Sequence, residues 1–198
     1  MQSLALAVVT AAVARTAVSW SAREAGTRRL AWPAAGLAAV AAAVVAAASA
    51  VPVAAGLAAG GIVAAAVVDA AERRIPTPVA NGTTAVSMAV LGVYAGARGE
   101  AGRLLVRPGL LALALAVGLG LLWVLRAAGM GDVRLGAATV TAMVGGAEAV
   151  LLVAWCAFAT VGLVAVGLHL TGHRPARRLP FGPGLAVGWL VAILATGA

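Results

Sequence analysis

The stretch that decides the fold is PVAAGLAAGGIVAAAVVD at residues 52–69, whose one charge stands at its last position. An apolar helix of about this length crosses most of the ~30 Å hydrocarbon core of a bilayer. Most of its residues are Ala, Val and Gly, so neighbouring helices can approach it closely through small side chains. The stretch therefore predicts a membrane span that ends in an acid at the membrane interface.

The composition extends this prediction to the whole chain. Of its 198 residues, 63% are hydrophobic and 10% are charged, whereas soluble domains carry about 25% charged residues. The mean hydropathy of +1.06 points the same way, and together these values exclude a soluble fold. At about 20 residues per span, the chain has room for about seven or eight spans and for no soluble domain of useful size.

The apolar stretches divide the chain into eight segments. They run at about 3–20, 31–48, 52–69, 78–97, 108–127, 134–147, 148–170 and 182–197. We expect an all-α, polytopic membrane helical bundle of seven to eight segments, forming a single domain over residues 1–198. The sixth and eighth segments are short, so we expect them to be tilted, partly re-entrant or next to a water-filled cavity. The first has no basic region before it, which favours a retained span over a cleaved signal peptide.

The arginines predict the orientation. With the N-terminus outside, ten of them lie in inner loops or at their edges and three in outer loops, which fits the positive-inside rule. The inner ones are Arg23, Arg28, Arg29, Arg73, Arg74, Arg126, Arg134, Arg174, Arg177 and Arg178, and the outer ones are Arg98, Arg103 and Arg107. The loops at 21–30, 70–77, 128–133 and 171–181 are then cytoplasmic. The net charge of +8 reflects topology and anionic lipid, and we expect no nucleic-acid binding.

The chain has two aspartates, Asp69 and Asp132. We expect both to terminate helices at the cytoplasmic edge and to lie close together in a compact bundle. Asp69 precedes the Pro76 turn, and Asp132 stands in GMGDVRLG, where Gly129 and Gly131 remove side-chain bulk. Two close carboxylates near a low-dielectric boundary are costly to ionise together, so one would stay protonated and one charged around a shared water. Aspartic proteases activate water in this way.

A structural interpretation of the same acids is also open. Each carboxylate could be solvated at a helix end or paired with Arg73, Arg74 or Arg134. The scarcity of acids in the chain and the unusual residues around both aspartates favour a functional role, because ionisable groups within membranes are functional candidates by default. We expect Glu72, by contrast, to be a solvated loop acid beside Arg73 and Arg74.

A third unusual segment, RRLPFGPGLAVGWL at residues 177–190, precedes the last apolar stretch. Pro180 and Pro183 alternate with Gly182 and Gly184 around Phe181. One proline would suit a helix start, but the combination predicts a shaped loop at the cytoplasmic face.

Three motifs in this order resemble those of the type IV prepilin peptidases. They are Asp69 followed by Ile75 and Pro76, GMGD at 129–132 followed by Val-Arg-Leu, and LPFGPGLAVG at 179–188. A GxGD motif alone is weak evidence, but three motifs in order on a polytopic chain are a specific combination. The resemblance covers roughly residues 50–198.

The resemblance implies a membrane aspartic endopeptidase of the cytoplasmic (inner) membrane. Such an enzyme cleaves the basic leader of type IV prepilins or of pilin-like secretion subunits, at the cytoplasmic face and after a Gly. Asp69 and Asp132 match the catalytic pair. A substrate-shaping role is implied for the remaining motif residues, which are Gly129, Gly131, Pro76, Pro180, Phe181, Gly182 and Pro183.

The chain departs from many bacterial relatives, which carry a large cytoplasmic insert with paired CxxC motifs associated with N-methylation of the pilin. Here the loop at 21–30 is about ten residues long and has no Cys. We therefore expect the peptidase without the methyltransferase, as in shorter archaeal or tight-adherence pilus enzymes. Cys156 lies in an apolar run, and His169 and His173 have no third ligand nearby, so we expect neither a metal nor an organic cofactor.

Two other classes of protein remain open at this stage. A small proton-coupled transporter could use the same two acids as a relay, although it would favour acids nearer the centres of the spans. A presenilin-like protease shares the GxGD element, but no tyrosine precedes Asp69 and PFGP stands where a PAL motif would be expected. The sequence does not indicate which aspartate is the general base, which pilus or secretion system is served, or the oligomeric state.

Overall fold

The computed structural model describes residues 2–22, 25–49, 51–100, 102–125, 129–141, 147–172 and 179–197. Within these ranges the regular structure is entirely helical, which confirms the predicted all-α class. The elements in chain order are α1 (Gln2–Ser21), α2 (Ala25–Arg28), α3 (Ala31–Ala48), α4 (Pro52–Glu72), α5 (Thr77–Arg98), the π-helical turn η1 (Gly102–Val106), α6 (Arg107–Val124), α7 (Met130–Thr141), α8 (Ala147–Leu170) and α9 (Gly182–Thr196). Of the loop residues discussed above, Arg23, Arg126, His173, Arg174, Arg177 and Arg178 lie outside the described residues.

Each of the eight predicted apolar stretches overlaps a helix in the described part of the chain, and several of these helices are long enough to span a bilayer. In the described part of the chain, four segments meet the length and hydropathy that a span needs, and they belong to α1, α3, α4 and α8. α6 and α9 are apolar but shorter. α7 has 12 residues, which is about 18 Å of helix and less than the thickness of the hydrocarbon core. The chain is thus a helical membrane protein.

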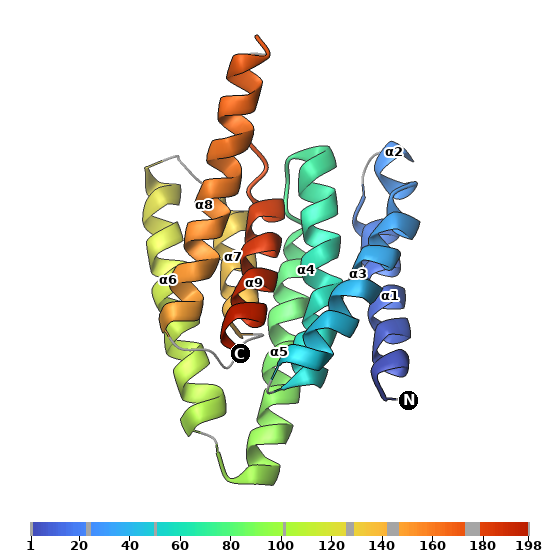
Figure 1. Ribbon diagram of the computed structural model, residues 1–198, viewed down its shortest axis with the longest axis vertical. Coiled ribbons are helices and arrows are strands. Elements are labelled where there is room, and N and C mark those ends of the chain that lie inside the picture. The colour runs from blue at the N-terminus through green and yellow to red at the C-terminus, as the bar shows by residue number, and fades with distance from the viewer. Residues whose placement is uncertain are drawn as a thin grey trace.

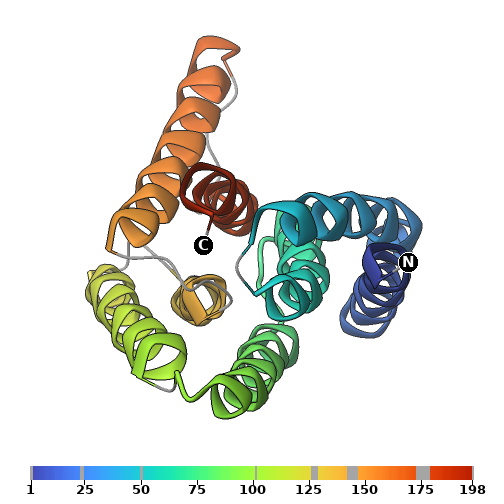
Figure 2. The same cartoon turned by 60° about the horizontal axis from the view of Figure 1, so that its bottom comes forward.

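Helix α4 lies at the centre of the bundle (Figure 1). It contacts α1 and α3 on one side and α5, α7 and α9 on the other (Figure 2). Of the most apolar stretch of α4, 72% is buried, against 17% of the corresponding stretch in α1 and in α8. Small residues allow this, because Ala and Gly let five neighbouring helices approach one backbone.

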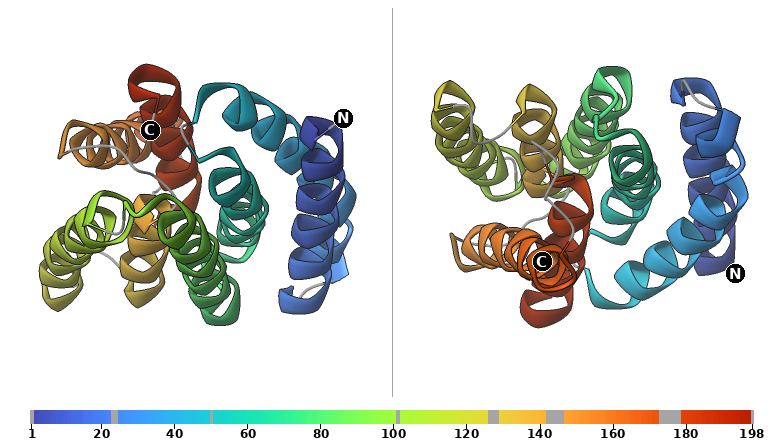
Figure 3. Two further views of the ribbon diagram at one scale, coloured as in Figure 1. Left: turned by 90° about the horizontal axis from the view of Figure 1, so that it is seen from below. Right: turned by 90° about the horizontal axis from the view of Figure 1, so that it is seen from above.

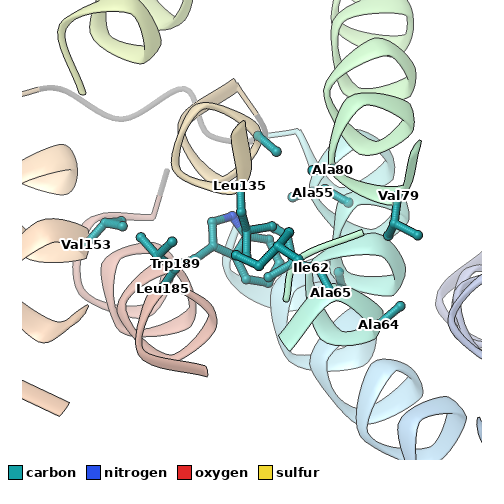
Figure 4. Packing of buried hydrophobic residues seen from close by; sticks show 14 of the residues in the cluster. Ala55, Ile62, Ala64, Ala65, Val79, Ala80, Leu135, Val153, Leu185 and Trp189 are labelled. Carbon is teal, nitrogen blue, oxygen red and sulfur yellow. The ribbon is translucent and has the colours of Figure 1, made fainter. Parts of the chain in front are cut away.

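The main core is built around α4 and α9, and most of its members are alanines. Trp189 of α9 is its largest fully buried side chain. Its indole ring lies with Ile62 of α4 and Leu135 of α7 in one cluster (Figure 4). One large side chain among many small ones therefore holds together the three helices that carry the sequence motifs.

Helix α9 packs closely on α8 through two glycines one helical turn apart. A methyl group added at Gly184 would lie 2.8 Å from the carbonyl oxygen of Ala157, and one added at Gly188 would lie 2.5 Å from that of Val153. Any side chain at these positions would push the helices apart. α8 itself extends beyond the end of the bundle at which α9 begins (Figures 1 and 3).

The structure corrects two predictions about the motifs. Asp132 does not terminate a helix, because α6 ends at Val124 and Asp132 is the third residue of α7. An acid in a first turn can bind the free backbone N–H groups there, so this position suits it. Gly182 and Pro183 are not part of a loop either, since they are the first two residues of α9, where proline costs no hydrogen bond.

Candidate active site

Asp69 occupies the last turn of α4 and is buried, with 4% of the residue exposed. Its Oδ2 accepts a hydrogen bond of 2.7 Å from the backbone N–H of Gly182. The backbone of Phe181 also lies close to the same carboxylate. The acid therefore caps the N-terminus of α9 from another helix, and 113 residues of chain separate the two partners.

The contact between α4 and α9 depends on the absence of a side chain at Gly182. A methyl group there would lie 3.0 Å from both Cβ and Oδ2 of Asp69, and 3.4 Å from Cα of Ala66. The sequence motif identified Gly182 as a site residue, but with a substrate-shaping role. In the structure it also supplies the backbone donor to Asp69, a role that sequence reasoning missed.

Asp132 is half-buried in the first turn of α7. Its Oδ2 accepts a hydrogen bond of 2.7 Å from the backbone N–H of Gly129, and its own N–H donates to the Gly129 carbonyl at 3.0 Å. This is the half of a capping box in which the side chain reaches back to the residue before the helix. A methyl group at Gly129 would lie 3.2 Å from Oδ2, so the first glycine of the motif leaves space for this bend.

The fold brings the two carboxylates together. Asp69 and Asp132 are close enough to repel each other electrostatically, although they are far apart in sequence. Each accepts a hydrogen bond at or near the N-terminus of a helix, α9 for Asp69 and α7 for Asp132. Because helix N-termini carry partial positive charge, both acids face a favourable dipole. Two carboxylates that share a water can act on it as acid and base.

The Ile75–Pro76 segment packs directly against the start of α7. A methyl group at Gly131 would lie 2.8 Å from Cβ of Ile75 and 3.4 Å from its carbonyl oxygen. Both Ile75 and Pro76 are buried, and Pro76 is the residue that precedes α5. The second glycine of GMGD thus lets α7 approach the turn that follows Asp69.

Two arginines near the acids have other partners. Arg134 donates from Nη1 to Oγ1 of Thr77 at 2.7 Å, which ties α7 to the start of α5. Arg74 forms an ion pair of 2.7 Å with Glu72, whose side chain is only 4% exposed, and it also donates to the Ser21 carbonyl. The prediction that Glu72 is a solvated loop acid is therefore wrong, because its carboxylate is buried beneath Arg74.

The other residues of the PFGP element lie around the start of α9. Phe181 packs edge-to-face on Phe158 of α8, with ring centroids 5.2 Å apart. Pro180 and Pro183 are half-buried before and within the first turn. Thr77 was missed by sequence reasoning, which considered Arg134 only as a partner for the aspartates, whereas in the structure Arg134 binds the Thr77 hydroxyl.

Across the described ranges, no group of three or more His, Cys, Asp or Glu side chains is placed to hold a metal ion. No protein-family model, curated protein or solved structure matches the chain. The motifs and the geometry around the two acids are therefore what indicates a function.

Proposed function

We propose that this protein is a membrane aspartic endopeptidase that removes the basic leader of type IV prepilins or pilin-like secretion subunits. The observation that carries the proposal is the proximity of Asp69 and Asp132 at the ends of α4 and α7. The first turn of α9, with Gly182 bound to Asp69, completes the constellation. The motifs that resemble the prepilin peptidases thus adjoin one another around the acid pair.

The chemistry needs only these two carboxylates and a water. The ionised acid takes a proton from the water as the water oxygen attacks the scissile carbonyl carbon. The protonated acid donates a hydrogen bond to the carbonyl oxygen. Collapse of the tetrahedral species breaks the C–N bond, and a proton passes to the leaving amine. General acid–base catalysis of this kind is worth about 10²–10⁴ in rate.

The proposal includes a topology and a substrate. The N-terminus lies outside, the eight apolar segments make up the bundle, and the acid pair faces the cytoplasm at the inner membrane. The substrate has a cationic leader followed by an apolar helix, which approaches the bundle laterally within the lipid. No N-methyltransferase activity and no cofactor are part of the proposal.

The test is cleavage of candidate prepilins from the same genome by purified protein in lipid. We expect wild type to release a fragment of the size of the leader, and Asp69→Asn and Asp132→Asn each to lower kcat by about 10²–10⁴-fold. Glu148→Gln is the matched control, because Glu148 is an exposed acid in the first turn of α8. It should cleave at the wild-type rate.

Circular dichroism and thermal unfolding establish that the variants are folded. Undiminished cleavage by either aspartate variant would rule out the acid pair as the catalyst. If wild type cleaves nothing but moves protons across liposomes, the protein is a transporter and the proposal is wrong.

A further inference from the structure

A second site lies on the opposite side of α4 from α9. α1 and α5 both pack on α4 (Figure 2), and between them is a cavity of about 590 Å³ lined by all three helices. Its lining residues include four apolar side chains and two glycines, namely Val9, Val13, Leu57, Val86, Gly61 and Gly82. We call this cavity, together with the polar cavity described next, the α1–α5 groove.

The α1–α5 groove changes from apolar to polar along its length. A second cavity of about 410 Å³ shares Trp20 and Pro78 with the first. Its other walls include Ser21, Arg74 and Thr77. The groove thus has an apolar part within the span and a polar part at the end where α1 and α4 finish.

This groove is separate from the acid pair. The Asp69 carboxylate points toward Gly182 on α9, whereas Leu57 and Gly61 of α4 face the groove. The buried Ile75–Pro76 segment stands between the polar cavity and Gly131 of the acid motif. A molecule in the groove would therefore not touch either aspartate through this wall.

The charge at the polar end selects the kind of occupant. Two segments follow the ends of α1 and α4, at residues 22–30 and 70–77. Their described residues carry four positive charges and one negative charge, from Arg28, Arg29, Arg73 and Arg74 and from Glu72. Arg74 lines the cavity with 27% of its side chain exposed. This basic rim repels a cationic leader peptide and attracts a phosphate group. Trp20, 71% exposed at the end of α1, is a residue type that favours the level of the lipid head groups.

We propose that the α1–α5 groove binds one anionic phospholipid, with an acyl chain along Leu57 and Gly61 and the phosphate beside Arg74. The apolar length of the groove matches a hydrocarbon chain, and the basic rim matches the headgroup. The lipid occupies the space between α1 and α5 and joins both helices to α4.

The test is native mass spectrometry of the full-length protein in detergent, titrated with phosphatidylglycerol or with phosphatidylcholine of the same chains. We expect the wild-type protein to retain one molecule of phosphatidylglycerol in preference to phosphatidylcholine. Gly82 lines the groove, and an added Cβ there meets nothing within 4 Å, so Gly82→Leu places a large side chain in the groove and should lose that bound lipid. Gly96→Leu is the matched control on α5, since it is equally open but lies outside the groove, and it should retain the lipid.

A second variant tests the headgroup contact. Glu72→Gln with Arg74→Gln leaves the net charge of the protein unchanged, and it should lower the preference for phosphatidylglycerol because it removes the guanidinium group that contacts the phosphate. Thermal unfolding checks that it is folded. Equal retention of both lipids by wild type, or full retention by Gly82→Leu, would overturn the proposal.

Substrate is absent from these measurements, so they stand apart from the proposed proteolysis. If Gly82→Leu keeps its lipid but no longer cleaves prepilin, the groove takes the substrate helix and the lipid proposal is wrong.

Discussion

Asp69 shows how a buried acid depends on a neighbour without a side chain. Its carboxylate is held by the backbone N–H of Gly182 at 2.7 Å, and the first atom of any side chain at Gly182 would lie 3.0 Å from the same oxygen. Asp132 has a more local environment, because its partner Gly129 is three residues away. The position of Asp69 thus depends on the packing of α9, whereas that of Asp132 depends mainly on its own turn.

At this scale we predict that Gly182→Ala lowers kcat for leader cleavage by about tenfold, because the Asp69 carboxylate must shift by a few tenths of an ångström and catalytic geometry tolerates little displacement. The measurement is the rate of cleavage at saturating substrate.

The control for this change is Gly162→Ala on the open face of α8, where an added methyl group meets nothing within 4 Å. It should leave kcat unchanged and stabilise the helix by up to about 1 kcal/mol. An unchanged rate in Gly182→Ala would show that the hydrogen bond does not position the acid for catalysis.

Helix α9 is positioned by α8 and by the core. Gly184 and Gly188 bring its backbone onto Ala157 and Val153, and Trp189 packs with Ile62 and Leu135 on its other side. Since the first turn of α9 binds Asp69, these contacts along the helix determine whether the acid keeps its partner. In a membrane such close backbone contacts are a main source of helix association.

At the scale of the element we predict that Gly188→Val destabilises the bundle by about 1–3 kcal/mol, because its Cβ would lie 2.5 Å from the Val153 carbonyl oxygen and overpacking costs this much. It should also reduce cleavage, since α9 would move at Asp69. The measurements are thermal unfolding in detergent and the cleavage rate.

Gly162→Val places the same side chain on the exposed face of α8. Because Gly162→Val makes the same change in helix propensity but meets no neighbouring atom, it isolates the effect of the interface. Equal unfolding temperatures for the two variants would contradict a close α8–α9 contact.

For the whole molecule, the distribution of arginines predicts the orientation in the membrane. We expect Gly26→Cys, in the α1–α3 turn, to react with an impermeant maleimide only after the cells are permeabilised. Ala97→Cys, at the far end of α5, should react in intact cells. Both are exposed positions, and Cys156→Ala provides a background without other thiols, because Cys156 is the one cysteine of the chain. The reverse labelling pattern would place the acid pair outside the cell.

The sequence by itself determined the class of protein and the location of its helices. Hydropathy alone divided the chain into eight stretches that each overlap a helix, because a bilayer forces apolar runs to satisfy their backbone groups as helices. The two aspartates stood out for a similar reason, since an acid is rare in such a chain. Their roles were inferred from motifs and stay a proposal.

The tertiary structure alone decided which helix supports which acid. Sequence patterns report exposure to lipid, and in a chain of Ala, Val and Gly nearly every face is apolar, so periodicity does not identify the neighbours of a helix. Only the packed bundle placed Gly182 on Asp69, Gly131 on Ile75 and Arg74 on a buried Glu72. The contacts of Gly182 and Gly131 join residues far apart in the chain, and close packing of backbones, rather than local preference, selects them.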